Sequence, residues 1–260
     1  MSGADRIEAA FTGCERRAAL MPYLMGGFPD MPTSLAIGNG YVDAGADLIE
    51  LGVPFSDPLA DGPVIQSAGT AALDAGASLD GVLGVAGELS ERVPVVLMCY
   101  SNAVLARGME QFVKDLAEAG VSGLIVPDLP LEEAPDTAAS CASAGVAFVP
   151  LAAPTSTDQR LAAIGSAAQG FLYTVAVAGT TGERGEDSDY AEVVARVRAH
   201  TSAPVALGFG ISTPEQASAA ADAGADGVII GSRLVREAAE ADDPAGACKS
   251  LVEQFAQALR

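Results

Sequence analysis

The chain has 260 residues, of which half are hydrophobic and only 18% are charged, and this composition excludes a disordered protein. Its formal net charge of −20 repels nucleic acid and anionic membrane surfaces, so we expect neither as a partner. Any anionic ligand must therefore be held by local groups rather than by the overall field.

Short apolar runs alternate with helical stretches along the whole chain. In chain order the runs predict buried parallel strands at residues 19–25, 47–52, 94–100, 122–128, 146–151, 170–176, 204–209 and 227–231. Stretches of helical period separate them, among them 109–119, 133–144, 189–199 and 214–223. Ala-Gly pairs at 44–45, 119–120, 144–145 and 223–224 end such stretches, as expected for glycine after a helix. Eight repeats without a break predict an α/β fold with a single domain over residues 1–260, a (β/α)8 TIM barrel rather than an open sheet.

Two predicted connections are longer than an ordinary loop, at residues 53–63 and 177–188. Both follow the C-terminal end of a strand, which is the end where barrel enzymes build their sites. The second contains three glycines between residues 177 and 185, and this predicts a lid.

Several kinds of chemistry lack the residues that they need. The two lysines, Lys114 and Lys249, fall in predicted outer helices, so no lysine is placed for a Schiff base. The single histidine, His200, and four widely spaced cysteines predict neither a metal site nor a disulfide framework. No apolar run approaches 18 residues and the N-terminus does not resemble a signal peptide, so we expect a cytoplasmic protein.

Carboxylate acid–base chemistry remains, and Glu50 is its best candidate. It lies near the C-terminal end of the apolar run 47–52, where a glutamate that faces into the barrel should have a raised pKa. The alternative is a glutamate paired with an arginine in the barrel wall. Asp57 and Asp61 follow in a proline-rich loop, and we expect one or both of them to reach over the barrel mouth, although loop aspartates often only form turns or cap helices.

Glycine-rich strand ends predict a phosphate site. Gly208 and Gly210 follow the seventh predicted strand, and Gly231 with Ser232 follows the eighth, each leading toward a helix. Backbone N–H groups at such loops approach an anion closely, and barrels commonly bind phosphate at these two places.

The stretch from Glu50 to Pro63 resembles the signature of the tryptophan synthase alpha subunit family. The likeness covers nearly the whole chain and continues through Gln66-Ser67, Tyr100-Ser101-Asn102, 126–133, 179–182, 208–212 and Gly231-Ser232. It implies a TIM barrel that cleaves indole-3-glycerol phosphate by a retro-aldol reaction to indole and glyceraldehyde 3-phosphate, without a metal or an organic cofactor of its own.

The resemblance also implies a role for each matching residue. Glu50 would be the acid–base group for the ring carbon and the glycerol hydroxyl, and Asp61 would accept the ring N–H. The implied substrate-binding residues are Tyr100 along the indole pocket, Tyr173 beside the carboxylates, Thr181 in the lid, and Gly182, Gly210, Gly231 and Ser232 at the phosphate.

The family implies a partner as well. Asp57, Pro58 and the loop around Asp128 would face a beta subunit in an α2β2 complex, and pyridoxal phosphate would belong to that partner. The chain departs from the family pattern at Phe28, Ala176 and Thr180, and none of these departures removes a catalytic carboxylate.

Three alternatives stay open. They are a free-standing indole-3-glycerol phosphate lyase, a mainly non-catalytic activator of a beta subunit, and another phosphosugar isomerase or lyase on the same fold.

Overall fold

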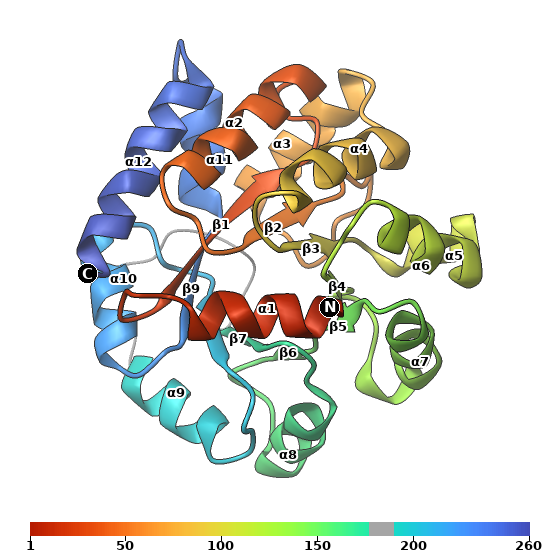
Figure 1. Cartoon of the computed structure of the whole chain (residues 1–260), viewed down its shortest axis with the longest axis vertical. Helices are drawn as coiled ribbons and strands as arrows, with labels where there is room; N and C mark the ends of the chain where they lie inside the picture. Colours follow the sequence, from red (N-terminus) through yellow and green to blue (C-terminus); the bar gives the residue numbers. More distant parts are fainter. Residues whose placement is uncertain (177–189) are drawn as a thin grey trace.

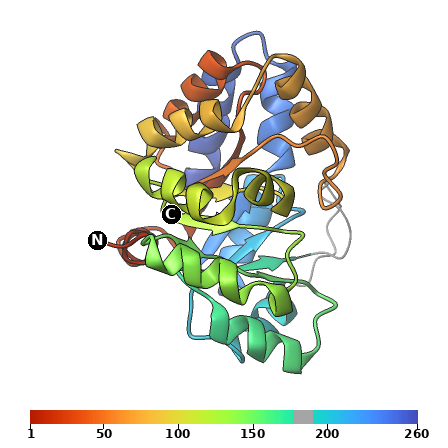
Figure 2. The ribbon, with the colours of Figure 1, turned by 90° about the vertical axis from the view of Figure 1, so that its right-hand side faces the viewer.

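One parallel sheet, curled into a barrel and surrounded by helices, forms the centre of the molecule (Figures 1 and 2). The computed structural model describes residues 1–176 and 190–260. Within these residues the strand order is β5-β4-β3-β2-β1-β9-β8-β7-β6. The strands are β1 (Ala19–Met25), β2 (Ile49–Gly52), β3 (Val95–Met98), β4 (Gly123–Ile125), β5 (Ala147–Phe148), β6 (Leu151–Ala152), β7 (Leu172–Val175), β8 (Val205–Gly208) and β9 (Gly227–Ile230).

The fifth predicted strand is split in two, and this split closes the barrel. Pro150 lies between β5 and β6 and has no N–H to donate to a ladder. The Val149 N–H still donates to the Leu124 carbonyl at 2.9 Å, and the Pro150 carbonyl accepts from the Tyr173 N–H at 3.2 Å. The segment therefore joins both ends of the strand order, which confirms the predicted TIM barrel.

All the helices except α1 (Gly3–Thr12) form the outer layer of the barrel (Figure 1). The outer helices are α2 (Met31–Asp43), α3 (Pro63–Asp74), α4 (Leu79–Ser90), α5 (Ser101–Arg107), α6 (Met109–Glu118), α7 (Pro135–Ser143), α8 (Asp158–Ala167), α9 (Tyr190–Arg198), α10 (Pro214–Asp222), α11 (Ser232–Glu240) and α12 (Pro244–Ala258), with a 3-10 turn at Leu131–Glu133. All four predicted helices are present. The four predicted Ala-Gly ends are confirmed too, because Gly45, Gly120, Gly145 and Gly224 all have positive φ.

Helix α1 covers the end of the barrel where the strands begin. Its Ile7 side chain is fully buried and packs in the cluster that fills the barrel interior. Arg6 donates from Nη1 to the carbonyl of Gly120, just before β4, at 2.8 Å. The opposite end of the barrel, where the strands finish, is not covered by α1 and contains the candidate active site.

Side chains alternate between the barrel interior and the helical layer along each strand. In β2 and the residue before it, Leu48 belongs to the interior cluster, whereas Ile49 and Leu51 belong to the cluster beneath the helices. Glu50 therefore faces the interior, as predicted.

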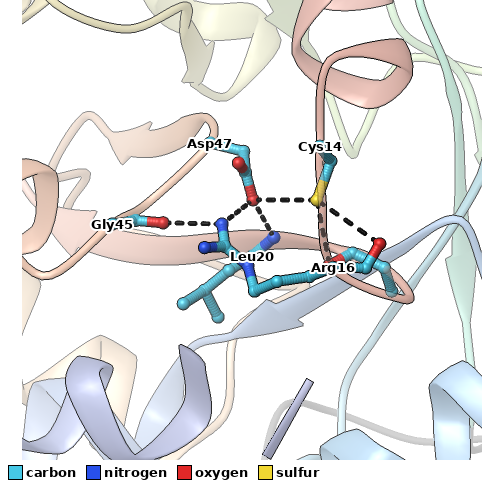
Figure 3. Close-up of polar contacts among 6 residues, drawn as sticks. Cys14, Arg16, Leu20, Gly45 and Asp47 are labelled. Atoms are coloured by element: carbon cyan, nitrogen blue, oxygen red, sulfur yellow. Dashed lines mark hydrogen bonds and ion pairs between the residues drawn. The ribbon is translucent and has the colours of Figure 1, made fainter. Parts of the chain in front are cut away.

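Two copies of one polar arrangement tie the strands together at the end away from the site. In the first (Figure 3), Arg16 pairs with Asp47 and donates to the Gly45 carbonyl at 2.7 Å, while Asp47 accepts from the Leu20 N–H at 2.7 Å. The same sequence, Ala-Gly-Ala-Asp, recurs at 223–226. There Arg198 pairs with Asp226 at 2.6 Å and donates to the Gly224 carbonyl at 2.7 Å, and the Val205 N–H donates to Asp226 at 2.7 Å.

Candidate active site

A pocket of about 530 Å³ opens at the C-terminal ends of the strands. The lining comes from the five strands β1, β2, β3, β7 and β9, from the loops after β2 and β8, and from the starts of α3 and α11. The described residues that line it are Tyr23, Glu50, Asp61, Ile65, Met98, Tyr173, Phe209, Gly210, Ile211, Ser212, Ile229, Gly231, Ser232 and Arg233.

Glu50 is a buried carboxyl group without a hydrogen-bond partner. Its side chain lies between Tyr23 of β1 and Val96 of β3 in the strand register, and the residue is 1% exposed. Neither carboxyl oxygen has a hydrogen-bond partner among the residues described, so the predicted alternative of a pairing arginine is wrong. Burial, and after it the charge of Asp61, raises the pKa of Glu50 to about 8. Glu50 therefore holds a proton at neutral pH.

Asp61 brings a second carboxyl group into the pocket from the loop 53–62. Backbone bonds fold this loop back, because the Asp61 N–H donates to the Pro58 carbonyl at 3.1 Å and the Gln66 amide donates to the Asp61 carbonyl at 2.8 Å. Burial raises the pKa of Asp61 to about 6, and a hydrogen bond from the Tyr100 hydroxyl opposes this rise. Asp61 has the lower pKa and therefore ionises first. Its negative charge then raises the pKa of Glu50, whereas Glu50 is still uncharged when Asp61 loses its proton.

Tyr100 lies behind Asp61 and is absent from the pocket lining. Besides its bond to Asp61, its hydroxyl accepts from the Ala60 N–H at 3.0 Å, and its ring stacks on Phe55 with the ring centres 5.1 Å apart. Tyr100 therefore fixes both the position and the charge of Asp61. In the structure Tyr100 contacts the loop 53–62, and its predicted place along the indole pocket stays a prediction.

Two tyrosines flank Glu50 inside the pocket. Tyr173 of β7 was expected beside the carboxylates, and it lines the same pocket as both of them. Tyr23 was missed by sequence reasoning. The available signal was its place in the register, since Tyr23 aligns with Glu50 on the neighbouring strand.

The glycine-rich loops after β8 and β9 also line the pocket. Gly210 has φ +91° directly after Phe209 at φ +69°, and Gly231 is the cap of α11, which begins at Ser232. As the N-cap residue, Gly231 has no side chain to cap the first N–H groups of α11. Arg233 also lines the pocket, but its guanidinium pairs with Glu237 at 2.6 Å. The backbone of these loops is therefore the group best placed to bind an anion.

The predicted interface residues lie outside this pocket. Asp57 and Asp128 are exposed, and Pro58 is partly exposed. Asp128 accepts from the N–H and the hydroxyl of Ser101, at 2.8 and 2.6 Å, and so fixes the start of α5. The predictions for Thr181, Gly182 and the lid at 177–188 concern a part of the chain that lies outside the described residues.

The family model described as tryptophan synthase alpha chain matches residues 11–260. This chain belongs to that family. The tryptophan synthase alpha chain of Thermosynechococcus vestitus is 44% identical over 260 residues, covering 98% of this chain and 96% of that protein. The alpha chain of Phenylobacterium zucineum is 46% identical, covering 98% and 95%.

Solved structures agree with the family. A chain of Mycobacterium tuberculosis tryptophan synthase matches with a TM-score of 0.91 at 39% identity, covering 98% of each chain. A chain of the tryptophan synthase α2β2 complex of Pyrococcus furiosus matches with a TM-score of 0.87 at 34% identity, covering 93% of this chain and 99% of that one.

The two lysines lie where the sequence predicted, away from the pocket of this alpha chain. Lys114 on α6 pairs with Glu118 at 3.7 Å, and Lys249 on α12 pairs with Asp43 at 3.9 Å. No helix within residues 1–176 or 190–260 is long and apolar enough to cross a membrane.

Proposed function

We propose that this tryptophan synthase alpha chain cleaves indole-3-glycerol phosphate to indole and glyceraldehyde 3-phosphate, with Glu50 and Asp61 as its catalytic residues. The observation that carries the proposal is one pocket in which a buried carboxyl group with a pKa of about 8 and a carboxyl group with a pKa of about 6 both face glycine-lined loops. At neutral pH the first is an acid and the second is a base.

The two carboxyl groups divide the retro-aldol reaction between them. Asp61, ionised, accepts a hydrogen bond from the indole N–H and stabilises the positive charge that develops when the ring is protonated. Glu50, protonated, gives its proton to the ring carbon that carries the glycerol chain. The Glu50 carboxylate then takes the proton of the adjacent glycerol hydroxyl as the carbon–carbon bond breaks. Glu50 regains its proton, so the cycle needs no cofactor.

The remaining pocket residues bind the two ends of the substrate. Gly210, Gly231 and Ser232 present backbone N–H groups and a hydroxyl for the phosphate, supported by the uncapped start of α11. Tyr173 borders the reacting atoms, and Tyr100 acts through Asp61. We include Thr181 and Gly182 in the site on the family resemblance alone.

A beta subunit is the proposed partner, in an α2β2 complex that this chain joins at the barrel mouth. Asp57, Pro58 and Asp128 are the proposed contacts. Two exposed apolar side chains support this surface, because Leu59 in the same loop is 86% exposed and Leu105 on α5 is 73% exposed.

We further propose that residues 1–260 form one domain, supported by the single continuous strand order. A cytoplasmic location is proposed on the chemistry of the thiols. The four cysteines are all free, which suits a reducing compartment.

The decisive experiment measures indole release from indole-3-glycerol phosphate by the purified chain, alone and with a beta subunit. We expect activity that the partner increases, and a near-complete loss in Glu50→Gln and Asp61→Asn. Equal activity with and without the partner would instead indicate a free-standing lyase. Absence of indole formation by the complex would indicate a non-catalytic activator.

A further inference from the structure

The hydroxyl of Tyr23 is a buried donor with no oxygen or nitrogen acceptor among the described residues. Tyr23 is 6% exposed, and the one polar contact of its hydroxyl is the Met25 sulfur at 3.9 Å. A thioether is a weak acceptor, so this contact satisfies the hydroxyl poorly. A buried tyrosine hydroxyl usually has a better partner.

The strand register aligns Tyr23 with the catalytic carboxyl group. Tyr23 on β1 is aligned with Glu50 on β2, and both side chains face the barrel interior. The Tyr23 ring leans toward the barrel mouth across β2, since a Cβ placed on Gly52 would lie 2.0 Å from the Tyr23 hydroxyl oxygen. Only glycine at position 52 leaves room for the hydroxyl there. The sequence thus provides a space for this hydroxyl on the mouth side of Glu50.

Glu50 lacks the donor that its function needs. Its two oxygens have no hydrogen-bond partner, yet the proposed cycle passes through its carboxylate form. An ionised carboxylate inside an apolar barrel is strongly disfavoured unless a donor reaches it.

The other groups that face this site are few. Asp61 comes from the loop after β2, Tyr100 stands behind Asp61, and Tyr173 comes from β7. Arg233 at the start of α11 pairs with Glu237. The remaining described lining side chains are uncharged, namely Ile65, Met98, Phe209, Ile211, Ser212, Ile229 and Ser232.

Both carboxyl groups of the pocket act on the Tyr23 hydroxyl. Burial is the main cause of the raised pKa of Tyr23, and the charges of Asp61 and then of Glu50 raise this pKa further. The pKa of Tyr173 is also raised by both charges, but there the charge of Glu50 has a larger effect than the charge of Asp61.

We propose that Tyr23 is a positioning residue for the reaction, whose hydroxyl turns from the Met25 sulfur to donate a hydrogen bond to the Glu50 carboxylate when Glu50 has given its proton to the substrate. The inference rests on the proposed function for its role in turnover. The hydrogen bond itself depends only on the ionisation of Glu50. Tyr23 transfers no proton in this scheme and touches no reacting atom.

The test is Tyr23→Phe, which keeps the ring and removes the donor. The kcat/KM of indole release is measured against pH, and thermal melting confirms folding. We expect kcat to fall about 10-fold, the size of one hydrogen bond to a charged group. The alkaline limb of the profile should move up by about one pH unit, because the Glu50 carboxylate loses a stabilising donor.

A matched control is Tyr41→Phe. Tyr41 on α2 is 1% exposed and its hydroxyl bonds to Cys248, far from the pocket lining, so this variant loses a buried hydroxyl without a change in the pH profile. Gly52→Ala perturbs the Tyr23 hydroxyl from the other side and should move the limb in the same direction as Tyr23→Phe. Tyr173→Phe tests the other tyrosine.

A second readout needs no turnover. Infrared difference spectra of the substrate-free protein follow the carbonyl band of protonated Glu50, assigned by its loss in Glu50→Gln. An upward shift of this titration in Tyr23→Phe supports the inference even if wild-type protein releases no indole, which would refute only the proposed function. An unmoved titration in Tyr23→Phe overturns the inference, and so does a shift found in Tyr173→Phe alone.

Discussion

Replacement of Glu50 by glutamine should abolish turnover and at the same time stabilise the folded chain at neutral and alkaline pH. The two effects have one cause. Glu50 has a pKa of about 8 in the folded protein, against an ordinary value of 4.5. The folded state therefore holds a proton that the unfolded chain releases, and this difference makes folding less favourable as pH rises between the two values.

The magnitude follows from that pKa difference. Below pH 4.5 Glu50 is protonated in both states and contributes no penalty. Each pH unit above this costs about 1.4 kcal/mol, so the penalty is roughly 3 kcal/mol at pH 7 and reaches about 5 kcal/mol above pH 8. Glutamine has the same shape and stays neutral at every pH. The protonated Glu50 carboxyl group has no hydrogen-bond partner among the described residues, and we expect none for the glutamine amide. The substitution therefore removes only the free-energy cost of ionising Glu50.

The assay is urea unfolding followed by circular dichroism at pH 5, 6, 7 and 8, with indole release measured on the same samples. We expect the stability difference between Glu50→Gln and wild type to grow from under about 1 kcal/mol at pH 5 to several at pH 8, while turnover falls about 10²- to 10⁴-fold. Glu88→Gln, at an exposed position on α4, is the control and should show no such trend. A stability difference that stays constant from pH 5 to 8 would refute a buried, protonated Glu50.

Three further predictions concern the same residues and the opposite end of the barrel. The kcat/KM of the wild-type protein should be bell-shaped in pH, with an acid limb near 6 where Asp61 ionises and an alkaline limb near 8 where Glu50 loses its proton, as steady-state kinetics would show. Tyr100→Phe removes the hydrogen bond that lowers the pKa of Asp61, so the acid limb should move up by about half to one pH unit in the same assay. Asp47→Ala should lower the free energy of unfolding by about 2–4 kcal/mol in urea titrations, because it leaves the buried Leu20 N–H without its acceptor and removes the ion pair of Arg16. Its KM should not change, since Asp47 lies at the far end of the strands from the pocket.

The strand pattern was predictable because parallel barrel strands are buried on both faces and appear as continuous apolar runs. All eight predicted runs contain observed strands, and β1 has the predicted bounds. The split at Pro150 was not predicted, since the pattern does not show that each half pairs with a different neighbour. Helix α1 was also missed, because its place depends on Ile7 entering the barrel and on Arg6 reaching carbonyls far along the chain.

The site was predictable where one residue and its own strand carry the information. Glu50 faces inward by simple alternation, and the glycines stand at strand ends. The place of Tyr23 and the contact between Tyr100 and Asp61 were not predictable in this way. The first depends on the register between two strands, and the second depends on how the loop 53–62 folds back on α5.

The carboxyl groups at the two ends of the barrel differ in their partners. Those at one end are paired and stabilise the fold, whereas those at the other end are unpaired and are proposed to carry the reaction. At the end where the strands begin, Asp47 and Asp226 each pair with an arginine and accept a strand N–H, which keeps charge satisfied and ties neighbouring strands together. At the mouth, Glu50 and Asp61 have no ion pair within the described residues. A cation beside Glu50 would remove its penalty but would also leave it ionised, and an ionised Glu50 has no proton to give. The unpaired state is therefore a requirement of acid catalysis, and the paired carboxylates at the far end help the fold to tolerate it.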